Sequence, residues 1–536
     1  MVKHVAIIGG NFLGCATAYY IRKKLPDVEI TIFEKSDRLG GKDFRTISIE
    51  DEGNKLEGKR DVLVGRMAHV DVSRCKFFKE LMRDADIFLR LDGENVYKTW
   101  GLFDWDKDEY TVWNGLYGWN YPLKVLAGFL AFVYGLLWIL HIPLRGLQTS
   151  FWVALCIVIL SFGTLIRKYA PRIVTDFQAH MAFNGAPWSV VSLVKLFENH
   201  MEKVRGNQTS TKGELSLTSF LKRRGLLGYT MRPLREEFTN YDIDSKFYWS
   251  IIRPLLQIGS NTSAGSLREC NALTGLLCTS QCSMIPRRKG VEHLYPIDAK
   301  IVCDALAKRA KASVRLNTNV VSVDSKDDGN CYNVKIKTAQ GATSMQANFS
   351  SVVLCCTPPL TEFSLSGSET LDTVLLKAQQ KRVHAKDITS HFSQGRAQYV
   401  NVIKGSLRAD YFGEDAEHLV PDYVILNNSI AFHSVLRISK NIFCVYSRRN
   451  LSESPKDFEY LFEEFEKDKA KSEAIEPSSY SIRPMSQDSE IGDDLPIKVE
   501  KGFLYPAAVK RVGGGVELDC MMGQNIANIL HEIAAE

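Results

Sequence analysis

Three glycines and one carboxylate near the N-terminus have the types and spacing of a dinucleotide-binding site. Gly9 and Gly10 follow an apolar run at residues 4–8, and Gly14 lies in the opening turn of a helical pattern. Glu34 closes a second apolar run at residues 28–33. Gly9 would allow the turn, Gly14 would let the helix pack on the strand, and the helix N-terminus would attract a diphosphate. Glu34 would bind the ribose hydroxyl groups.

Asn11 departs from this pattern. It stands at the middle position of G-x-G-x-x-G, where a glycine normally lets the backbone approach the phosphates. Asparagine tolerates a left-handed backbone but adds bulk. We therefore expect nucleotide binding to be weakened or rearranged unless the side chain turns away. A strand-helix-strand unit that binds no nucleotide is the alternative interpretation.

A second glycine pair favours FAD over NAD. The stretch from Lys35 to Lys42 reads KSDRLGGK, so that Gly40 and Gly41 begin six residues after Glu34. This resembles the glutathione-reductase-type FAD site, where the motif continues as E-x(5)-G-G-R. Lys42 stands where that family places Arg, which keeps the positive charge but not the planar, two-pronged donor.

Later segments supply the elements that would complete such a site. A helix is expected at residues 298–310, strands at 313–316, 319–323 and 332–337, and a buried strand at 351–358 that proline ends. In two-domain flavin oxidoreductases of this type, a returning valine lies at the FAD and an apolar strand ending in A-T-P lies near the flavin. Val320 and Thr357 occupy those places.

The C-terminus places a glycine turn before a helix. Residues 513–515 are three glycines, and a helix is expected from about residue 518 to 535. A helix N-terminus suits the pyrimidine edge of a flavin, which carries negative charge when reduced. Gly514 and Glu517 are therefore candidate cofactor residues. Residues 467–496 are Ser-rich and charged, and we expect a surface loop there.

Composition limits the other function classes. At 536 residues the chain is too long for one simple core, and its formal charge of +5 is too slight to indicate nucleic-acid binding. The twelve cysteines include one adjacent pair and one C-x3-C spacing, neither of which is a zinc signature. No metal site is expected, and free thiols suit a reducing compartment.

Two apolar segments predict membrane attachment. Residues 125–144 and 147–166 contain no Asp, Glu, Lys or Arg, and only Arg145 and Gly146 separate them. Each has about the length that crosses a bilayer, so we predict a helical hairpin. Basic flanking residues would keep the rest of the chain in the cytosol. A buried or interfacial helix pair is the alternative. No cleaved signal peptide is expected, because the first strand begins at His4.

Taken together, the chain resembles the prenylcysteine oxidase (prenylcysteine lyase) family as a distant member with degenerate FAD motifs. The resemblance rests on the N-terminal unit and on four later stretches, namely 300–306, 319–323, 352–358 and 481–535. It implies an FAD-dependent thioether oxidase that acts on farnesyl- or geranylgeranyl-cysteine. Molecular oxygen would be consumed, and a prenal, free cysteine and hydrogen peroxide would form. The family also suggests a lysosomal or other endomembrane location.

The expected fold class is α/β, a glutathione-reductase-type Rossmann domain for FAD interleaved with a substrate domain, plus the membrane hairpin. The expected segments are FAD-binding parts at 1–60, 298–360 and 496–536, substrate-domain parts at 61–120 and 361–495, the hairpin at 121–170 and a helical cap at 171–297. Two other functions remain open: a membrane-anchored relative that binds prenyl groups or a protein without catalysis, and a flavin amine oxidase-like enzyme acting on another lipid. No catalytic residue is assigned, because hydride abstraction needs mostly positioning.

Overall fold

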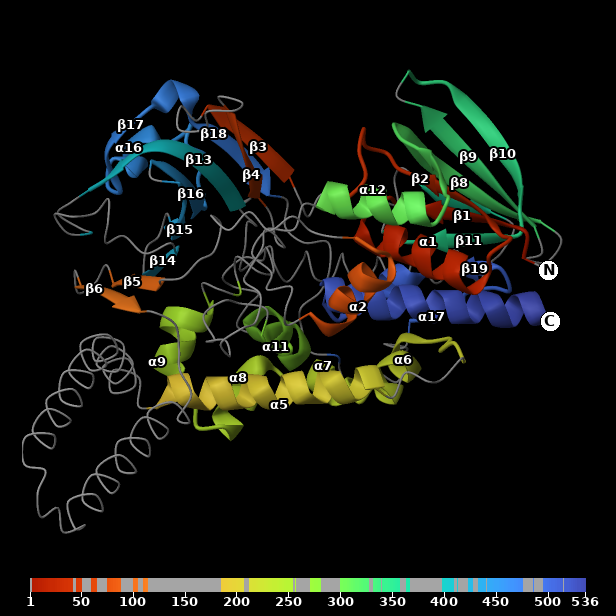
Figure 1. Cartoon of the computed structure of the whole chain (residues 1–536), viewed down its shortest axis with the longest axis horizontal. Helices are drawn as coiled ribbons and strands as arrows, with labels where there is room; N and C mark the ends of the chain where they lie inside the picture. Colours follow the sequence, from red (N-terminus) through yellow and green to blue (C-terminus); the bar gives the residue numbers. More distant parts are fainter. Residues whose placement is uncertain are drawn as a thin grey trace, which may run out of the picture.

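The computed structural model describes residues 2–41, 45–50, 59–64, 75–87, 100–104, 109–113, 185–206, 212–253, 256, 270–280, 299–326, 331–338, 340–356, 363–366, 398–408, 412, 423–427, 432–439, 441–475, 485, 495–513 and 515–536. These residues form one body around a parallel sheet, where both termini lie, and a second body around a large mixed sheet (Figure 1). A layer of helices lies beneath both bodies.

The parallel sheet gathers strands that are far apart in the sequence. Its order is β19-β11-β1-β2-β7, and the strands are β1 (His4–Ile8), β2 (Glu29–Phe33), β7 (Ser313–Arg315), β11 (Ser351–Leu354) and β19 (Phe503–Leu504). In the centre, Ala6 pairs with Thr31 on one side and Val352 on the other. Parallel strands covered on both faces need nearly continuous apolar runs, which β1 and β11 have. The strands predicted at residues 4–8, 28–33 and 313–316 are confirmed, whereas the strand predicted at 351–358 is shorter, because β11 ends at Leu354.

Helices cover this sheet. α1 (Phe12–Lys24) packs against α17 (Val516–Ala535) and α12 (Ala299–Arg309) (Figure 1). The α1 and α17 backbones approach closely at Gly523, where a Cβ would lie 3.1 Å from the Thr17 nitrogen. The sequence of α17 is apolar on most sides, and the helix is accordingly buried along most of its length.

A smaller sheet extends this body. Its order is β10-β9-β8-β12, and the strands are β8 (Thr318–Lys326), β9 (Cys331–Thr338), β10 (Thr343–Phe349) and β12 (Ser364–Ser366). β8, β9 and β10 pair antiparallel as a meander, and β12 joins β8 in parallel. The start of β8 follows directly on β7, so the meander is tied to the edge of the parallel sheet.

The second body is built on an eight-stranded sheet. The order is β17-β13-β16-β15-β14-β5-β6, with β18 also paired to β13, and the strands are β5 (Trp100–Asp104), β6 (Glu109–Trp113), β13 (Gln398–Leu407), β14 (Tyr423–Asn427), β15 (Phe432–Ser439), β16 (Ile442–Ser447), β17 (Phe462–Phe465) and β18 (Lys471–Ile475). β5 pairs in parallel with β14, which joins segments on either side of the chain's middle. The predicted domain boundaries themselves stay a prediction.

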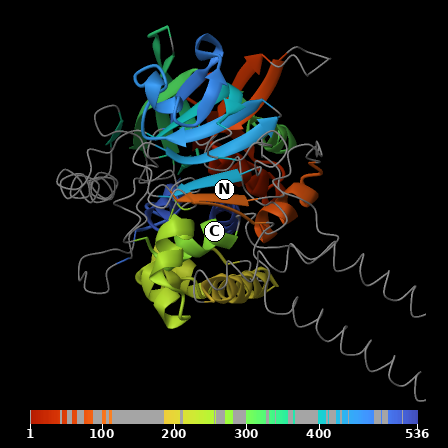
Figure 2. The ribbon, with the colours of Figure 1, turned by 90° about the vertical axis from the view of Figure 1, so that its left-hand side faces the viewer.

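The remaining elements are mostly helical. They are the hairpin β3 (Arg45–Glu50) and β4 (Lys59–Val64), and the helices α2 (Lys76–Asp84), α5 (Ala186–Gly206), α6 (Leu217–Arg223), α7 (Leu227–Met231), α8 (Leu234–Asn240), α9 (Ser245–Phe247), η2 (Tyr248–Ile252), α11 (Ala272–Ser280), α16 (Pro455–Phe458), η5 (Lys467–Lys469) and η6 (Pro506–Arg511). The large sheet lies above the helices α5 to α9 in the turned view (Figure 2). α11 packs against α5, α7 and α8 within this layer.

Two predictions need comment here. The loop predicted at residues 467–496 is wrong in part, because residues 467–475 form η5 and β18. Among the described strands β18 has β13 as its partner, and charged side chains do not prevent pairing at such an edge position. The predicted membrane hairpin lies outside the described residues. Among the described helices, none is both long enough and apolar enough to cross a bilayer.

Candidate nucleotide-binding site

The turn between β1 and α1 is built from glycines for steric reasons. Gly9 has a φ of +105° and donates from its N–H to the Phe33 carbonyl oxygen at 2.9 Å, which joins the ends of β1 and β2. At Gly14 a Cβ would lie 2.0 Å from the Gly9 carbonyl oxygen. A side chain at Gly14 would therefore force the helix off the strand, as the sequence pattern predicted.

Asn11 caps the helix that the turn begins. Its Oδ1 accepts a hydrogen bond from the Gly14 N–H at 3.0 Å, and its Nδ2 donates to the Cys355 carbonyl oxygen at 2.9 Å. The side chain thus bridges the helix N-terminus and the end of β11. The N–H groups of Phe12 and Leu13 make no hydrogen bond within the described chain. Two helix N–H donors therefore remain for an anion, and a neutral amide takes the third.

Glu34 lies at the carboxyl end of β2, next to this turn. Its Oε2 accepts from the Gly10 N–H at 2.7 Å and its Oε1 accepts from the Ser36 N–H at 2.9 Å. The side chain is buried, with 8% of its surface exposed. Each carboxylate oxygen can accept one further hydrogen bond. Glu34 is therefore fixed in place with capacity left for ligand hydroxyl groups.

The second glycine pair folds back onto the first. Gly40 donates from its N–H to the Gly10 carbonyl oxygen at 2.9 Å and pairs with Asn11 in an isolated parallel bridge. Gly40 and Gly41 have φ values of +110° and +73°. A Cβ at Gly40 would lie 3.3 Å from the Lys300 nitrogen in the first turn of α12. The segment after Glu34 thus completes the wall of the corner.

The other N-terminal candidates lie around this corner. Val320 is buried in β8, and the chain just before it is tied to Glu34, whose carbonyl oxygen accepts from the Thr318 N–H at 2.8 Å. Lys35 is exposed beside Glu34. Lys42 lies outside the described residues. Their contacts with a cofactor remain predictions.

The glycine turn before α17 is anchored by a second capping asparagine. Asn271 accepts from the Thr274 N–H at 2.9 Å and donates to the Val512 carbonyl oxygen at 3.0 Å, and the Thr274 hydroxyl donates to the same oxygen. Gly513 and Gly515 have φ values of +139° and +155°. Asn followed three residues later by Thr, ahead of an apolar run, is a helix-start pattern that the sequence analysis missed. Gly514 and Thr357 lie outside the described residues.

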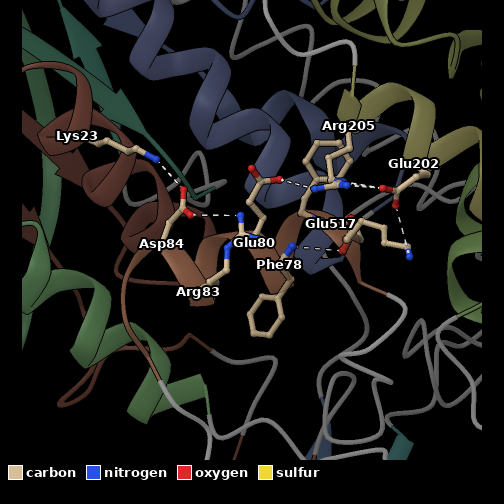
Figure 3. A network of polar contacts seen from close by, with 10 residues as sticks. Lys23, Phe78, Glu80, Arg83, Asp84, Glu202, Arg205 and Glu517 are labelled. Atoms are coloured by element: carbon tan, nitrogen blue, oxygen red, sulfur yellow. Dashed lines mark hydrogen bonds and ion pairs between the residues drawn. The ribbon is translucent and has the colours of Figure 1, made fainter. Parts of the chain in front are cut away.

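Glu517 is turned towards α2. Its Oε2 accepts from the Phe77 N–H at 3.0 Å and its Oε1 accepts from the Phe78 N–H at 3.3 Å (Figure 3). Burial raises the pKa of Glu517 to about 8, and the two backbone donors oppose that rise. The carboxyl group of Glu517 therefore caps α2 from a distant part of the chain. Its predicted contact with a flavin stays a prediction.

Ion pairs hold α2 between its neighbours (Figure 3). Lys23 of α1 pairs with Asp84 at 2.6 Å, and Arg205 of α5 reaches Glu80 at 3.5 Å and also Glu202. These groups are partly exposed, so each pair contributes little to stability. Their arrangement nevertheless fixes α2 against both α1 and α5.

Three helix N-termini meet at the carboxyl edge of the parallel sheet. The Phe12 and Phe78 rings lie 5.5 Å apart, which places the starts of α1 and α2 together, and Glu517 joins the start of α17 to α2. Helix N-termini carry partial positive charge and suit anions such as a diphosphate. In the part of the chain that the structure describes, no group of three or more His, Cys, Asp or Glu side chains could hold a metal ion.

This geometry defines the class of protein, an α/β protein with a Rossmann-like dinucleotide corner. Residues 7–57 match the model of an NAD(P)-binding Rossmann-like domain. Residues 192–535, well over half of the chain, match the prenylcysteine lyase model. The chain belongs to the prenylcysteine lyase family, and this places it among the flavin-dependent oxidoreductases.

Other similarities are shorter or more distant. Coproporphyrinogen III oxidase of Staphylococcus aureus (strain NCTC 8325 / PS 47) is 48% identical over 95 residues, which are 18% of this chain and 19% of that protein. The match therefore spans about a fifth of that relative. Among solved structures, cyclohexylamine oxidase from Brevibacterium oxydans IH-35A is similar with a TM-score of 0.48, 10% identity and full coverage of both chains. Putrescine oxidase bound to putrescine has a TM-score of 0.47 at 10% identity, also with full coverage of both chains.

Proposed function

We propose that this protein is an FAD-dependent thioether oxidase that acts on prenylated cysteine. In the overall reaction, the C–H and C–S bonds of the allylic carbon break and a C=O bond forms. One thioether, one O2 and one water give one prenal, one cysteine thiol and one H2O2. Membership of the prenylcysteine lyase family supports the substrate class. The observation that carries the proposal is the Glu34 carboxylate held at the Gly9–Gly14 turn.

The residues at this corner fit FAD. The N–H groups of Phe12 and Leu13, which make no hydrogen bond within the described residues, would hold the diphosphate, and Glu34 keeps acceptor capacity for the ribose hydroxyls. The close packing of α1 on the turn requires glycine at position 14, because a Cβ there would lie 2.0 Å from the Gly9 carbonyl oxygen. When bound, the flavin supplies the hydride acceptor for carbon oxidation. The protein's own part is to seat the diphosphate, orient the ribose and exclude water from the buried turn.

Attachment to a membrane is part of the proposal. A C15 or C20 prenyl chain partitions into lipid, because each buried CH2 contributes about 0.8 kcal/mol. The apolar segments at 125–144 and 147–166 would hold the enzyme where that substrate collects. We propose that the remainder of the chain faces the cytosol, which follows from the basic residues flanking the two segments.

A second candidate is a non-catalytic relative that binds prenyl groups or a protein partner. Asn11 favours it, since a neutral side chain already bonds the third N–H of α1. The affinity of the protein for FAD therefore distinguishes the oxidase from the non-catalytic binder.

The visible spectrum of the protein purified in detergent tests these proposals. An oxidase is expected to show flavin absorbance, either as isolated or after FAD is added, and to lose it when S-farnesyl-L-cysteine is added without oxygen. Readmitted oxygen should restore the absorbance and yield peroxide. A protein that takes up no FAD contradicts the oxidase and leaves the non-catalytic binder. Uptake of FAD with no bleaching contradicts the thioether substrate alone.

A further inference from the structure

A buried histidine and a half-buried arginine have no hydrogen-bond partners in the described chain. They are His433 on β15 and Arg253, which directly follows η2. Buried polar groups in proteins are nearly always hydrogen-bonded, so an unpaired pair requires an explanation. Neither residue belongs to the nucleotide corner.

His433 is placed by an irregularity in β15. Phe432 pairs with Ser447 and Ser434 pairs with Tyr446, so His433 is the extra residue of a β-bulge. Bulges redirect a side chain and are frequent next to functional sites. The His433 side chain is 6% exposed, and its imidazole makes no hydrogen bond with another described residue. Burial lowers the pKa of His433 to about 3, and the charges of Arg448 and Arg253 add to this. The ring is therefore neutral at physiological pH and can donate one N–H.

Arg253 brings a positive charge to the same place. Its Nε is buried without a hydrogen-bond partner, and no carboxylate of the described residues lies within ion-pair distance. Its guanidinium carbon lies 5.2 Å from the centre of the Trp249 ring. Burial lowers the pKa of Arg253, yet arginine keeps its charge in proteins. A guanidinium with an unfilled donor is thus held against an aromatic face.

The backbone brings these groups together. η2 is a short stretch of π-helix, a form that is frequent at functional sites. η2 contacts β14, and β14 is the neighbour of β15, with Ile425 paired to Ser434 next to the bulge. The π-helix and the β-bulge therefore lie on either side of the same strand, β14.

We propose that Arg253 and His433 bind the carboxylate of a small organic acid. The guanidinium can donate two parallel N–H bonds to a carboxylate, and the neutral imidazole can donate a third. The neutral imidazole donates this hydrogen bond without carrying a charge of its own. The identity of the ligand rests on the proposed function: the carboxylate is the α-carboxylate of the prenylated cysteine. The site therefore selects the free amino acid over its carboxyl ester.

The affinities of S-farnesyl-L-cysteine and its methyl ester, measured calorimetrically in detergent with the full chain, test this site. The wild type is expected to bind the acid about tenfold to a hundredfold more tightly than the ester, the range of one or two charge-assisted hydrogen bonds. Arg253→Gln should remove that preference by weakening only the acid, and His433→Gln should reduce it. Arg235→Gln is the matched control, because Arg235 lies near Tyr248 but is exposed. An unchanged preference in Arg253→Gln overturns the proposal.

A second measurement needs no variant. Phenylglyoxal modifies accessible guanidinium groups, and mass spectrometry of the wild-type protein would report on Arg253. S-farnesyl-L-cysteine should protect Arg253 and its methyl ester should not. Equal protection by both overturns the proposal even if Arg253→Gln fails to fold.

These measurements separate the site from the proposed function. If the preference for the acid depends on Arg253 but the flavin is not bleached, the carboxylate site is supported and the oxidase function is contradicted. If the acid and the ester both bleach the flavin and bind with equal affinities, the oxidase function is supported and the carboxylate site is contradicted.

Discussion

The Asn11 side chain accepts a 3.0 Å hydrogen bond from the Gly14 N–H and donates one of 2.9 Å to the Cys355 carbonyl oxygen. Helix α1 therefore has its own neutral cap at the position where dinucleotide-binding turns normally have a bare glycine. The amide stabilises the corner and also occupies one of the donors that a diphosphate or its bound water would use.

The substitution Asn11→Gly tests whether the Asn11 side chain stabilises the turn while weakening FAD binding. Removing the side chain frees the Gly14 N–H and opens the turn, so FAD affinity is expected to rise roughly tenfold, about one hydrogen bond to a charged group. Without FAD, the free energy of unfolding should fall by about 1 kcal/mol, because the cap and the bond to Cys355 are lost. Quenching of flavin fluorescence and urea denaturation measure the two effects. Asn11→Asp keeps a capping oxygen but adds charge, and it should weaken FAD binding. Weaker FAD binding by Asn11→Gly would contradict this account.

Glu34→Gln should lower FAD affinity by about tenfold to a hundredfold, as expected for losing a charged acceptor. Glutamine has one acceptor oxygen, so either Gly10 or Ser36 also loses its partner. Equilibrium titration with FAD measures the loss. Glu29→Gln is the matched control, because Glu29 is exposed at the opposite end of the same strand. Equal losses in the two variants would show that Glu34 has no special part in binding.

Gly14→Ala should destabilise the whole parallel-sheet body. Its Cβ would lie 2.0 Å from the Gly9 carbonyl oxygen, and a backbone atom cannot move aside cheaply. We expect the free energy of unfolding to fall by about 3 kcal/mol, the upper range for overpacking. Chemical denaturation followed by circular dichroism measures it. Gly206→Ala, where no atom lies within 4 Å of the added Cβ, should change stability little. Similar midpoints for both variants would refute the steric argument.

Glu517 should make stability depend on pH. Burial raises the pKa of Glu517 from 4.5 to about 8, so the folded state retains a proton that the unfolded state releases above about pH 4.5. The contribution of this group is therefore favourable below that pH and is lost as the pH rises towards 8. Within that window the slope approaches about 1.4 kcal/mol per pH unit. Glu517→Gln should flatten the profile of unfolding free energy between pH 5 and 8. Superimposable profiles would exclude a protonated Glu517.

Asp519→Asn should cost more than an exposed substitution on the same helix. Lys510 Nζ contacts Asp519 Oδ1 at 2.8 Å and Oδ2 at 2.9 Å, and both side chains are largely buried. Removing the carboxylate leaves a buried cation without compensation, so the free energy of unfolding should fall by about 3 kcal/mol. Lys510→Met with Asp519→Leu should recover much of that loss, which urea denaturation can measure. If the double substitution is as unstable as the single one, buried charge is not the cause.

The local parts of the fold were predictable because they depend on neighbours in the sequence. The β1–α1–β2 unit follows from apolar periodicity and from Gly9 and Gly14, and the predicted helix near residues 298–310 appears as α12. The strand β18 was missed because pairing at a sheet edge leaves charged side chains exposed, so that its sequence looks like a loop.

Sequence alone determined the chemistry available at the nucleotide corner, since the spacing from Gly9 to Glu34 fixes which groups meet where two adjacent parallel strands end. Only the tertiary structure decided the surroundings and the hydrogen-bond partners of four polar side chains, namely Asn11, Glu517, Arg253 and His433. Glu517 meets Phe77 across 440 positions of chain, and η2, which Arg253 follows, contacts β14, the neighbour of the strand that carries His433. Contacts of that range depend on how helices and sheets pack, and no local periodicity specifies which buried partner a polar side chain finds.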